Sequence, residues 1–284
     1  MKIFLVSPSV DILFKKEQLA QLEKLGDLHV VKTIKPLLEV EELFDGTEDR
    51  ILAIDPDFVE WKLSNDVLAK MPNLKAIVLQ TTSFDWLDVK YCAEKKIPVV
   101  NLRGFSSEAV AEWALWLALT TARNVPVIAK GNWEQNYSFP GVELKGKKAG
   151  VIGIGRIGSR IAELSKGVGM NVSYWSRRKS SDMYGWVELE NLMSDSDIIF
   201  LALPLSPETK GIIPAEMINK MKKTAIFVSV VNHGIYDHDL LIKSAEAGKI
   251  YGYAFEEEGG KTFTKYKGNV CAVPALGWCT TDSM

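Results

Sequence analysis

Residues 150–158 read GVIGIGRIG, and this stretch decides the fold because a short β-branched run leads directly into the spacing G-x-G-x-x-G. A strand followed by these glycines and then by a helix is typical of a dinucleotide-binding turn. Gly153 permits the tight turn, Gly155 lets the backbone approach a pyrophosphate, and Gly158 lets the helix pack closely on the strand. A purely structural glycine turn is the other interpretation.

The residues that follow the glycine loop indicate which dinucleotide binds. Arg156 and Ile157 open the next helix, whose N-terminus favours an anion through its N–H groups and its dipole. The next strand ends at Ser176, Arg177 and Arg178, where an NAD site would need a carboxylate for the ribose 2′-OH. A hydroxyl and two guanidinium groups suit a 2′-phosphate instead. The sequence therefore predicts NADP rather than NAD, although a solvated basic turn has the same composition.

Short β-branched runs alternate with helical stretches along the whole chain, which predicts α/β architecture with parallel sheets. In the first third we expect helices at 17–25, 57–70 and 88–95, and strands at 3–6, 28–31, 51–54, 76–79 and 98–100. After residue 146 the pattern restarts, with helices expected at 157–168, 214–221 and 239–247, and strands at 150–152, 172–175, 198–203, 225–230 and 250–255. The chain therefore consists of two α/β units in series.

A long helix is predicted at residues 107–123, between the two units. Ser106 or Ser107 can cap its first turn. Its side chains are apolar on nearly every side and include Trp113 and Trp116. A helix without a polar face is expected to be buried, either between the domains or in a subunit interface, and a helix in the core of one domain is the other interpretation.

Composition excludes several classes of protein. The 284 residues suffice for about two domains. Lys plus Arg is 34 and Asp plus Glu is 36, so the net charge of −2 gives no general attraction to nucleic acid or to an anionic membrane. The apolar run at 3–6 is too short for a signal peptide, and none reaches the ~18 residues of a membrane span. Three cysteines without a C-x-x-C pair and three scattered histidines predict no metal site and a reducing, cytoplasmic location.

Several motifs, in one order, resemble the D-isomer-specific 2-hydroxyacid dehydrogenase family over about residues 50–280. Besides the glycine loop they are FDWLD at 84–88, IPVVN at 97–101, SEAVAE at 107–112, LPLSPETK at 203–210 and GIYD at 234–237. The resemblance implies a flavodoxin-like substrate domain at residues 1–100 and a Rossmann NAD(P)-binding domain at 101–275, with the substrate in the cleft between them. Residues 276–284 would be a shortened return segment, because family members usually continue with a helix here.

The resemblance also implies further site residues and partners. Backbone N–H groups of a loop that contains Thr81, Thr82 and Ser83 would meet the carboxylate of a small-molecule substrate. Further cofactor-binding residues would be Leu203, Pro204, Thr209, Val230 and Glu256. Family members are commonly dimers joined through the helix that matches 107–123, so we expect a homodimer, with neither nucleic acid nor membrane as a partner.

The Arg, Glu and His that catalyse the family's reaction are not all present. Asn232 takes the place of the Arg that binds the keto acid, and Ala275 takes the place of the proton-donating His. Glu256 takes the place of an Asp that touches the nicotinamide, and the Glu that normally follows is absent. His233 is the first candidate to replace the lost groups, unless it is an ordinary surface histidine. Weaker candidates, which also fit a solvated turn, are Tyr253, Lys261 and the glutamates Glu256, Glu257 and Glu258.

Three functions are compatible with these residues. The first is an NADP-dependent reductase of small 2-keto acids with a rebuilt catalytic set. The second is a catalytically inactive NADP-binding sensor or partner protein, and the third is a reductase of another carbonyl that needs no cationic clamp. They differ in whether an ionisable group faces the nicotinamide, because the site and not the fold determines the function.

Overall fold

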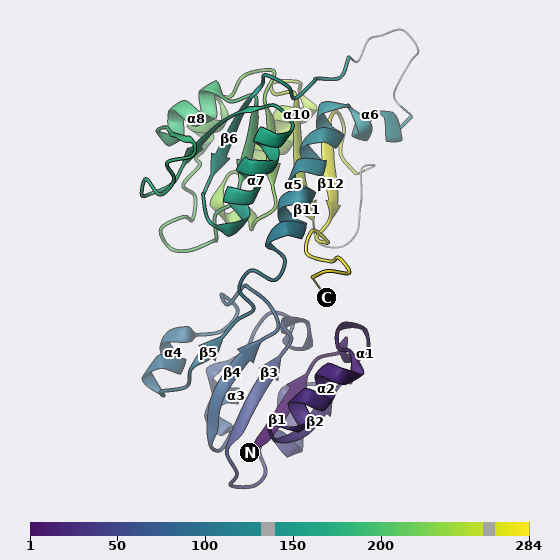
Figure 1. The fold of residues 1–284 in the computed structure, drawn as a ribbon, viewed down its shortest axis with the longest axis vertical. Coiled ribbons are helices and arrows are strands. Elements are labelled where there is room, and N and C mark those ends of the chain that lie inside the picture. Colours follow the sequence, from purple (N-terminus) through teal and green to yellow (C-terminus); the bar gives the residue numbers. More distant parts are fainter. Residues whose placement is uncertain (132–139, 258–264, 284) are drawn as a thin grey trace. The chain divides into compact units, whose positions relative to one another are not determined.

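The structure is a computed structural model that describes residues 1–131, 140–257 and 265–283. The chain divides into two compact units, Met1–Phe105 and Ser106–Ser283 (Figure 1). Each unit has its own parallel sheet and its own buried core.

The first unit is built on a five-stranded parallel sheet in the order β2-β1-β3-β4-β5. Its strands are β1 (Lys2–Val6), β2 (Asp27–Val31), β3 (Arg50–Ile54), β4 (Leu74–Leu79) and β5 (Val99–Val100). Its helices are α1 (Val10–Leu13), α2 (Lys16–Glu23), α3 (Asn65–Lys70) and α4 (Val89–Glu94), with 3₁₀ turns η1 (Leu37–Glu39), η2 (Glu41–Leu43) and η3 (Pro56–Val59). This strand order is that of the flavodoxin-like fold, which confirms the predicted class.

The predicted single helix at 57–70 is wrong, because the chain forms η3 and α3 as separate elements. Glu60 and Trp61 have φ angles of 50° and 56°, so the backbone is left-handed there and η3 ends. The hydroxyl of Ser64 then accepts a hydrogen bond from the Val67 N–H and starts α3. Apolar spacing does not reveal such a break when the residues on both sides face the same core.

The second unit is built on a seven-stranded parallel sheet in the order β12-β11-β10-β9-β6-β7-β8. Its strands are β6 (Lys148–Ile152), β7 (Asn171–Trp175), β8 (Gly185–Trp186), β9 (Ile198–Leu201), β10 (Ile226–Ser229), β11 (Gly252–Glu257) and β12 (Val270–Pro274). The order reverses between β6 and β9, which is the Rossmann arrangement and confirms that part of the prediction. The prediction does not include β8, which has only two residues, and it misses β12, which at five residues is as long as β1.

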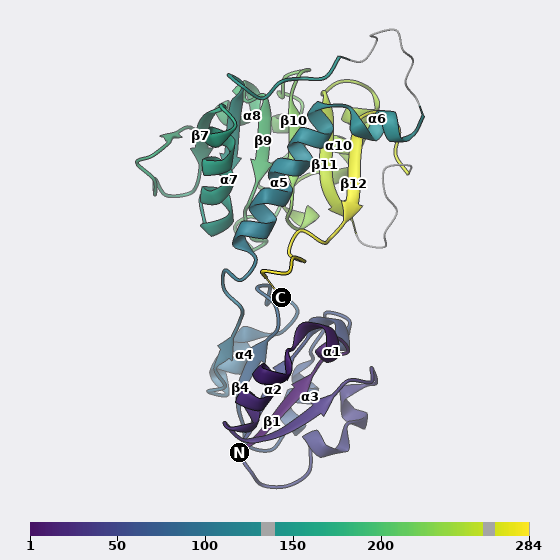
Figure 2. The same cartoon turned by 45° about the vertical axis from the view of Figure 1, so that its right-hand side comes forward.

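Helices cover both faces of the second sheet (Figures 1 and 2). They are α5 (Ser107–Ala122), α6 (Val125–Ala129), α7 (Arg156–Gly167), α8 (Leu189–Asp195), α9 (Ala215–Ile218) and α10 (His238–Glu246), with a 3₁₀ turn η4 (His233–Ile235). Phe200 and Val228 share one core with α5 and α7, whereas Ile199 and Phe227 share the other core with α8, α9 and α10. Strands buried on both faces explain why β9 and β10 are almost continuously apolar.

Within the single chain, helix α5 is buried on one side only, so it is not enclosed in the core of one domain. Ala114 and Leu117 are fully buried, whereas Trp116 and Leu119 are each 40% exposed. The predicted side-chain cap is also wrong, because no hydroxyl caps the helix start. The first turn is held instead by Glu108, which pairs with Arg160 of α7 at 2.7 Å.

No helix in the described ranges has the length and apolar content that crossing a lipid bilayer requires. Within the same ranges, no three or more His, Cys, Asp and Glu side chains come together in a way that could hold a metal ion.

Candidate functional site

The glycine loop lies between β6 and α7, where the strand order of the second sheet reverses. Gly153 has a φ of 95°, and a Cβ placed on it would lie 2.7 Å from the carbonyl oxygen of Ala202, just after β9. A Cβ on Gly158 would lie 1.8 Å from the carbonyl oxygen of Gly153. Side chains at these two positions would therefore collide with backbone, so the loop requires glycine at both.

Gly155 is open, in contrast to the other two glycines. It precedes α7, no side chain caps that helix, and a Cβ placed on Gly155 would meet nothing within 4 Å. Arg156 is exposed at the first position of the helix, and Ile157 is half-buried beside it. Uncapped N–H groups at a helix start, with open space and a cation beside them, form a cradle that fits a pyrophosphate.

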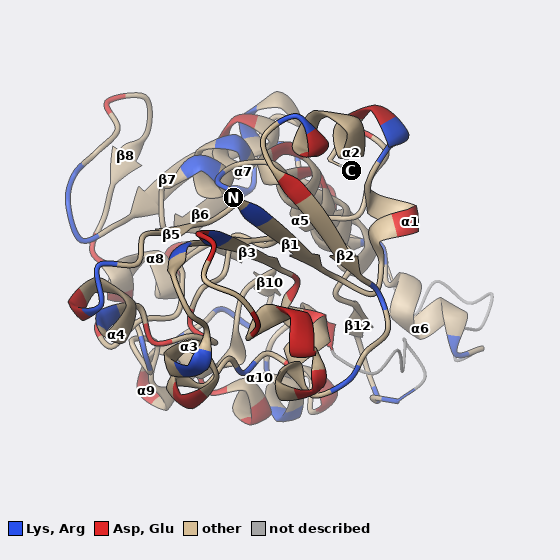
Figure 3. Ribbon diagram, turned by 90° about the horizontal axis from the view of Figure 1, so that it is seen from below, with Lys and Arg blue, Asp and Glu red and all other residues tan. Residues whose placement is uncertain are grey.

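A basic turn follows β7. Arg177 and Arg178 are exposed, and the Ser176 hydroxyl donates to the Arg178 carbonyl oxygen. The indole N–H of Trp186 donates to the Ser176 carbonyl oxygen at 3.0 Å, which fixes the start of the turn. Figure 3 shows the basic stretch in blue on the segment that joins β7 to β8. Hydrogen bonding by Ser206, with a smaller contribution from the Arg177 charge, lowers the pKa of Glu208.

The segment that follows β9 packs on the glycine loop. The Cδ2 atom of Leu203 would lie 2.8 Å from a Cβ on Gly153, and the next residue, Pro204, is exposed. Thr209 is buried, and its hydroxyl donates to the Pro204 carbonyl oxygen at 2.6 Å while it accepts from the Ser206 N–H at 2.8 Å. Thr209 thus shapes this segment, whereas Leu203 and Pro204 lie at its surface.

The positions expected to carry catalysis lie at the carboxyl ends of three neighbouring strands. Val230 and Asn232 follow β10, Glu256 lies near the end of β11, and Ala275 follows β12 directly. Glu256 is in register with Val273 of β12. Parallel sheets of this kind bind their ligands at this edge.

Asn232 and Ala275 bring neither a charge nor an acidic proton to this edge. The Oδ1 atom of Asn232 accepts a hydrogen bond from the Gly234 N–H at 2.8 Å, so the side chain caps η4. Ala275 is exposed and ends in a methyl group. The side chains at the positions that the resemblance assigns to a cation and a proton donor can therefore supply neither a positive charge nor a proton.

Glu256 ties the segment after β12 to the sheet. Its Oε1 atom accepts a hydrogen bond from the Gly277 N–H at 2.9 Å. A Cβ on Gly277 would lie 2.8 Å from that oxygen and 2.7 Å from the Trp113 ring, so this contact also needs glycine. Burial raises the pKa of Glu256, and the Gly277 N–H opposes the shift.

His233 belongs to a cluster of histidines and tyrosines at the same edge. Its Nε2–H group donates to the Glu256 carbonyl oxygen at 3.1 Å, and its ring stacks on His238 with centroids 3.9 Å apart. His238 Nδ1 lies 2.7 Å from the Tyr253 hydroxyl, which lies 2.7 Å from the Tyr236 hydroxyl. Burial, assisted by His233, lowers the pKa of His238 to about 4, so His238 is uncharged near neutral pH.

Sequence reasoning missed His238 and Tyr236 as neighbours of His233. Both are close in sequence, five and three residues after His233, whereas Tyr253 is brought beside the start of α10 by the pairing of β10 with β11. Tyr253 itself is fully buried, and burial raises its pKa well above the ordinary value. It supports His238 from inside the core and has no surface to offer a substrate.

The other weak candidates do not gather around His233 in the described residues. The carboxylate of Glu257 accepts from the Tyr266 hydroxyl at 2.7 Å and pairs with Lys265. Glu258 and Lys261 lie outside the described residues.

The predicted substrate loop follows β4 in the first unit. The Thr82 hydroxyl donates to the Leu102 carbonyl oxygen at 2.9 Å, and the Ser83 N–H lies 3.3 Å from the Thr81 hydroxyl oxygen. The Gln80 side-chain amide has buried nitrogen and oxygen atoms without a partner among the described residues. A buried amide is costly without hydrogen bonds, so this loop has capacity for a further polar group.

Comparison with known proteins assigns a family to this arrangement. The sequence profile described as "D-isomer specific 2-hydroxyacid dehydrogenase, NAD binding domain" matches residues 115–264. The chain is 36% identical over 255 residues to D-3-phosphoglycerate dehydrogenase of Methanocaldococcus jannaschii, covering 84% of this chain and 47% of that protein. It is 35% identical over 215 residues to glyoxylate reductase of Aeropyrum pernix, covering 69% of this chain and 64% of that protein.

The chain thus spans about half of the first relative and under two thirds of the second. Among solved structures, an acyclic imino acid reductase in complex with NADPH and D-Arg superimposes with a TM-score of 0.85, over 100% of this chain and 92% of that one. At 23% identity this likeness shows a shared fold.

Proposed function

Because the chain belongs to the D-isomer-specific 2-hydroxyacid dehydrogenase family, we propose that it binds NADP(H) at the glycine loop and reduces a small 2-keto acid or a related carbonyl. The observation that carries this proposal is the open cradle at Gly155, between two glycines whose Cβ atoms would strike backbone. The exposed Arg177 and Arg178, with no carboxylate at the end of β7, support NADP over NAD.

The proposed chemistry uses few residues of the chain. When bound, the reduced nicotinamide supplies a hydride to the carbonyl carbon. In its imidazolium form, His233 would donate the Nε2 proton, which the Glu256 carbonyl oxygen accepts in the structure, to the carbonyl oxygen as negative charge develops there. It would be left as neutral imidazole with the remaining proton on Nδ1. Uncharged His238 keeps the stacked pair from carrying two positive charges. Asn232 contributes at most a neutral hydrogen bond, since its side chain also caps η4.

The first unit would serve as the substrate domain and the second as the NADP-binding domain. Backbone groups of Thr81, Thr82 and Ser83, beside the unpartnered amide of Gln80, would meet the substrate carboxylate. Three free cysteines, two of them buried, suit a reducing cytoplasm.

Replacement of Arg177 by Ala tests the cofactor preference. We expect Arg177→Ala to weaken NADPH binding by ~1.5–3 kcal/mol, the scale of a hydrogen bond to a charged group, and to leave NADH binding nearly unchanged. Titration of the purified protein with each reduced dinucleotide measures both. Lys179→Ala is the matched control, because that ammonium lies over the Trp186 ring at 4.6 Å. Tighter binding of NADH than NADPH by the unmodified protein would contradict the preference.

We propose further that the protein is a homodimer joined through the exposed side of α5 and α6. Four apolar side chains are 37–48% exposed on these helices, namely Trp116, Leu119, Val125 and Ile128. Exposed apolar groups that cluster in this way favour a protein–protein contact.

Light scattering at micromolar concentration should therefore give twice the mass of the chain. Leu119→Glu should give a monomer, because it buries a charge in the proposed contact. Ile12→Glu, at an apolar position that is 76% exposed in the first unit, should leave the dimer intact. An unmodified protein that is monomeric under these conditions would rule out this contact.

A second candidate function is a catalytically inactive NADP-binding sensor or partner protein. Two observations favour it, namely the engagement of Asn232 as a cap and the methyl group of Ala275. This protein would bind NADPH with the same dependence on Arg177, but would not oxidise it with any carbonyl. A reductase of a carbonyl without a carboxylate would instead turn over ketones and aldehydes.

A further inference from the structure

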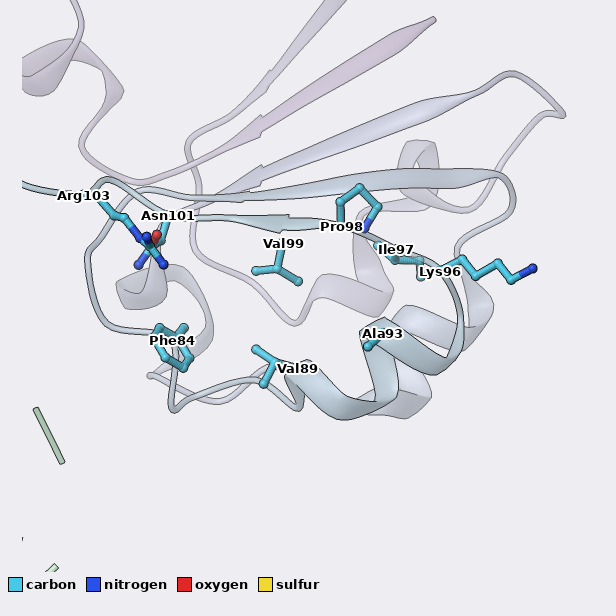
Figure 4. Close-up of a pocket in the computed structure, with 9 residues that line it drawn as sticks. All are labelled: Phe84, Val89, Ala93, Lys96, Ile97, Pro98, Val99, Asn101 and Arg103. Atoms are coloured by element: carbon cyan, nitrogen blue, oxygen red, sulfur yellow. The ribbon is translucent and has the colours of Figure 1, made fainter. Parts of the chain in front are cut away.

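An open surface cavity of about 580 Å³ lies on the first unit, between α4 and the edge strand β5, and most of the residues that line it are exposed. Its apolar wall consists of Phe84, Val89, Ala93, Ile97, Pro98 and Val99. Figure 4 shows Val89 and Ala93 on α4 facing Val99 of β5 across the open space. The volume lies in the ~300–1,000 Å³ range typical of small-molecule sites.

One end of this cavity carries a cation. Arg103 lies there beside Asn101, on the side of Phe84 (Figure 4). The guanidinium is exposed and has neither an ion pair nor a side-chain hydrogen bond to any described residue. No Asp or Glu is among the residues that line the cavity. The unpaired positive charge therefore favours an anionic group at this end.

The backbone around Arg103 is held in place before any ligand arrives. The Asn101 side-chain amide donates to the Thr82 carbonyl oxygen at 2.6 Å, and the Thr82 hydroxyl donates to the Leu102 carbonyl oxygen at 2.9 Å. The Leu102 N–H donates to the Thr81 carbonyl oxygen at 3.1 Å. A ligand thus loses little affinity to ordering the chain segment that binds it.

The second cation of the cavity is oriented differently. Lys96 lines the opposite end, but its side chain extends away from the open space (Figure 4). The cavity thus combines an apolar body with one guanidinium, which suits a ligand with a single carboxylate.

We propose that this cavity binds a small monocarboxylate with an apolar body, with the carboxylate on Arg103 and the hydrocarbon between α4 and β5. Strand β5 has two residues, which is too little to hold an extended peptide by strand pairing. The binding needs no dinucleotide. The 2-keto acids of apolar amino acids are members of this class, and they would bind here independently of the substrate site at Thr81, Thr82 and Ser83.

The test is calorimetric titration of the full chain, without cofactor, using 4-methyl-2-oxopentanoate as the probe. We expect saturable binding that Arg103→Gln weakens roughly ten- to a hundredfold, the range for a hydrogen bond to a charged group. Lys96→Gln removes the same charge at the other end and should leave the affinity unchanged. The neutral analogue 4-methylpentan-2-one should bind the unmodified protein and Arg103→Gln equally.

A second pair of variants tests the apolar part of the site. Ala93→Phe fills the space between α4 and β5 and should reduce binding of the probe at least tenfold, whereas Glu94→Phe adds the same ring outside the lining residues and should not. Three results would each overturn the proposal. The probe does not bind, or Lys96→Gln weakens its binding and Arg103→Gln does not. In the third, Ala93→Phe changes only the oligomeric state of the protein.

The outcomes separate this inference from the proposed reaction. Probe binding that depends on Arg103 without any NADPH oxidation supports the site and refutes the reductase. Reduction of 2-keto acids together with calorimetric binding of the probe that Arg103→Gln leaves unchanged supports the reductase and refutes the site.

Discussion

Gly158→Ala should abolish dinucleotide binding while Gly167→Ala, in the same helix, should not affect it. A Cβ at position 158 would lie 1.8 Å from the Gly153 carbonyl oxygen, so the glycine loop must move away from α7. A Cβ at position 167 meets nothing within 4 Å. Overpacking at position 158 should also lower the free energy of unfolding by ~1–3 kcal/mol. Gly167→Ala should leave it unchanged or raise it by up to about 1 kcal/mol.

Fluorescence titration with NADPH and chemical denaturation measure the two effects of Gly158→Ala. We expect its dissociation constant to rise roughly a hundredfold or more, because displaced N–H groups no longer converge on the pyrophosphate. The denaturation curve shows whether the variant is folded under the conditions of the titration. A folded Gly158→Ala protein that binds NADPH as tightly as Gly167→Ala would mean that the loop is a structural turn and that the dinucleotide binds elsewhere.

Asn232→Arg combined with Ala275→His should raise the turnover of glyoxylate or hydroxypyruvate with NADPH by roughly a hundredfold. That is the lower part of the range for a general acid, and we expect it because the Glu that normally assists the histidine is still absent. The arginine supplies the cation that orients the carboxylate, and the histidine supplies the proton. The two positions follow β10 and β12, which lie on either side of β11, so the substitutions act at one edge of the sheet.

The two single variants are the controls for this gain. Because the cation and the proton donor act as one unit, each single substitution should give much less than the pair. Initial rates of NADPH oxidation at saturating keto acid measure all of them. A double variant with the turnover of the unmodified protein would contradict the assignment of these positions.

The fold was predictable from the sequence where local pattern and tertiary structure agree. The glycine loop is one example, because the turn at Gly153 and the packing of Gly158 are both requirements of nearby backbone. The division of residues 57–70 was not predictable from apolar spacing, since it depends on left-handed conformations at Glu60 and Trp61. A strand of two residues such as β8 can be recognised only when its neighbours in the sheet are known.

The candidate site was predictable in part for the same reason. Asn232, Glu256 and Ala275 lie at or near strand ends, as a motif fixes a residue relative to its own strand, and their role in a site stays a prediction. The partners of these residues come from distant segments. The hydrogen bond between His238 and Tyr253 joins residues 15 apart in the sequence, and that between Gly277 and Glu256 joins residues 21 apart. No spacing rule in a single sequence specifies such pairs. Their identity depends on strand pairing and on side-chain packing.

The most direct test of the proposed reaction is the initial rate of NADPH oxidation by the unmodified protein and by His233→Ala, with hydroxypyruvate at saturation. The unmodified protein should be slow compared with ordinary family members, because the resemblance assigns the positions of the cation and the proton donor to Asn232 and Ala275. His233→Ala should reduce the remaining rate of NADPH oxidation by ~10²–10⁴, the contribution of a general acid. His29→Ala, which replaces a histidine of the first unit, should leave this rate unchanged. Turnover as fast as that of ordinary members, and unchanged in His233→Ala, would contradict both the degenerate catalytic set and the role of His233.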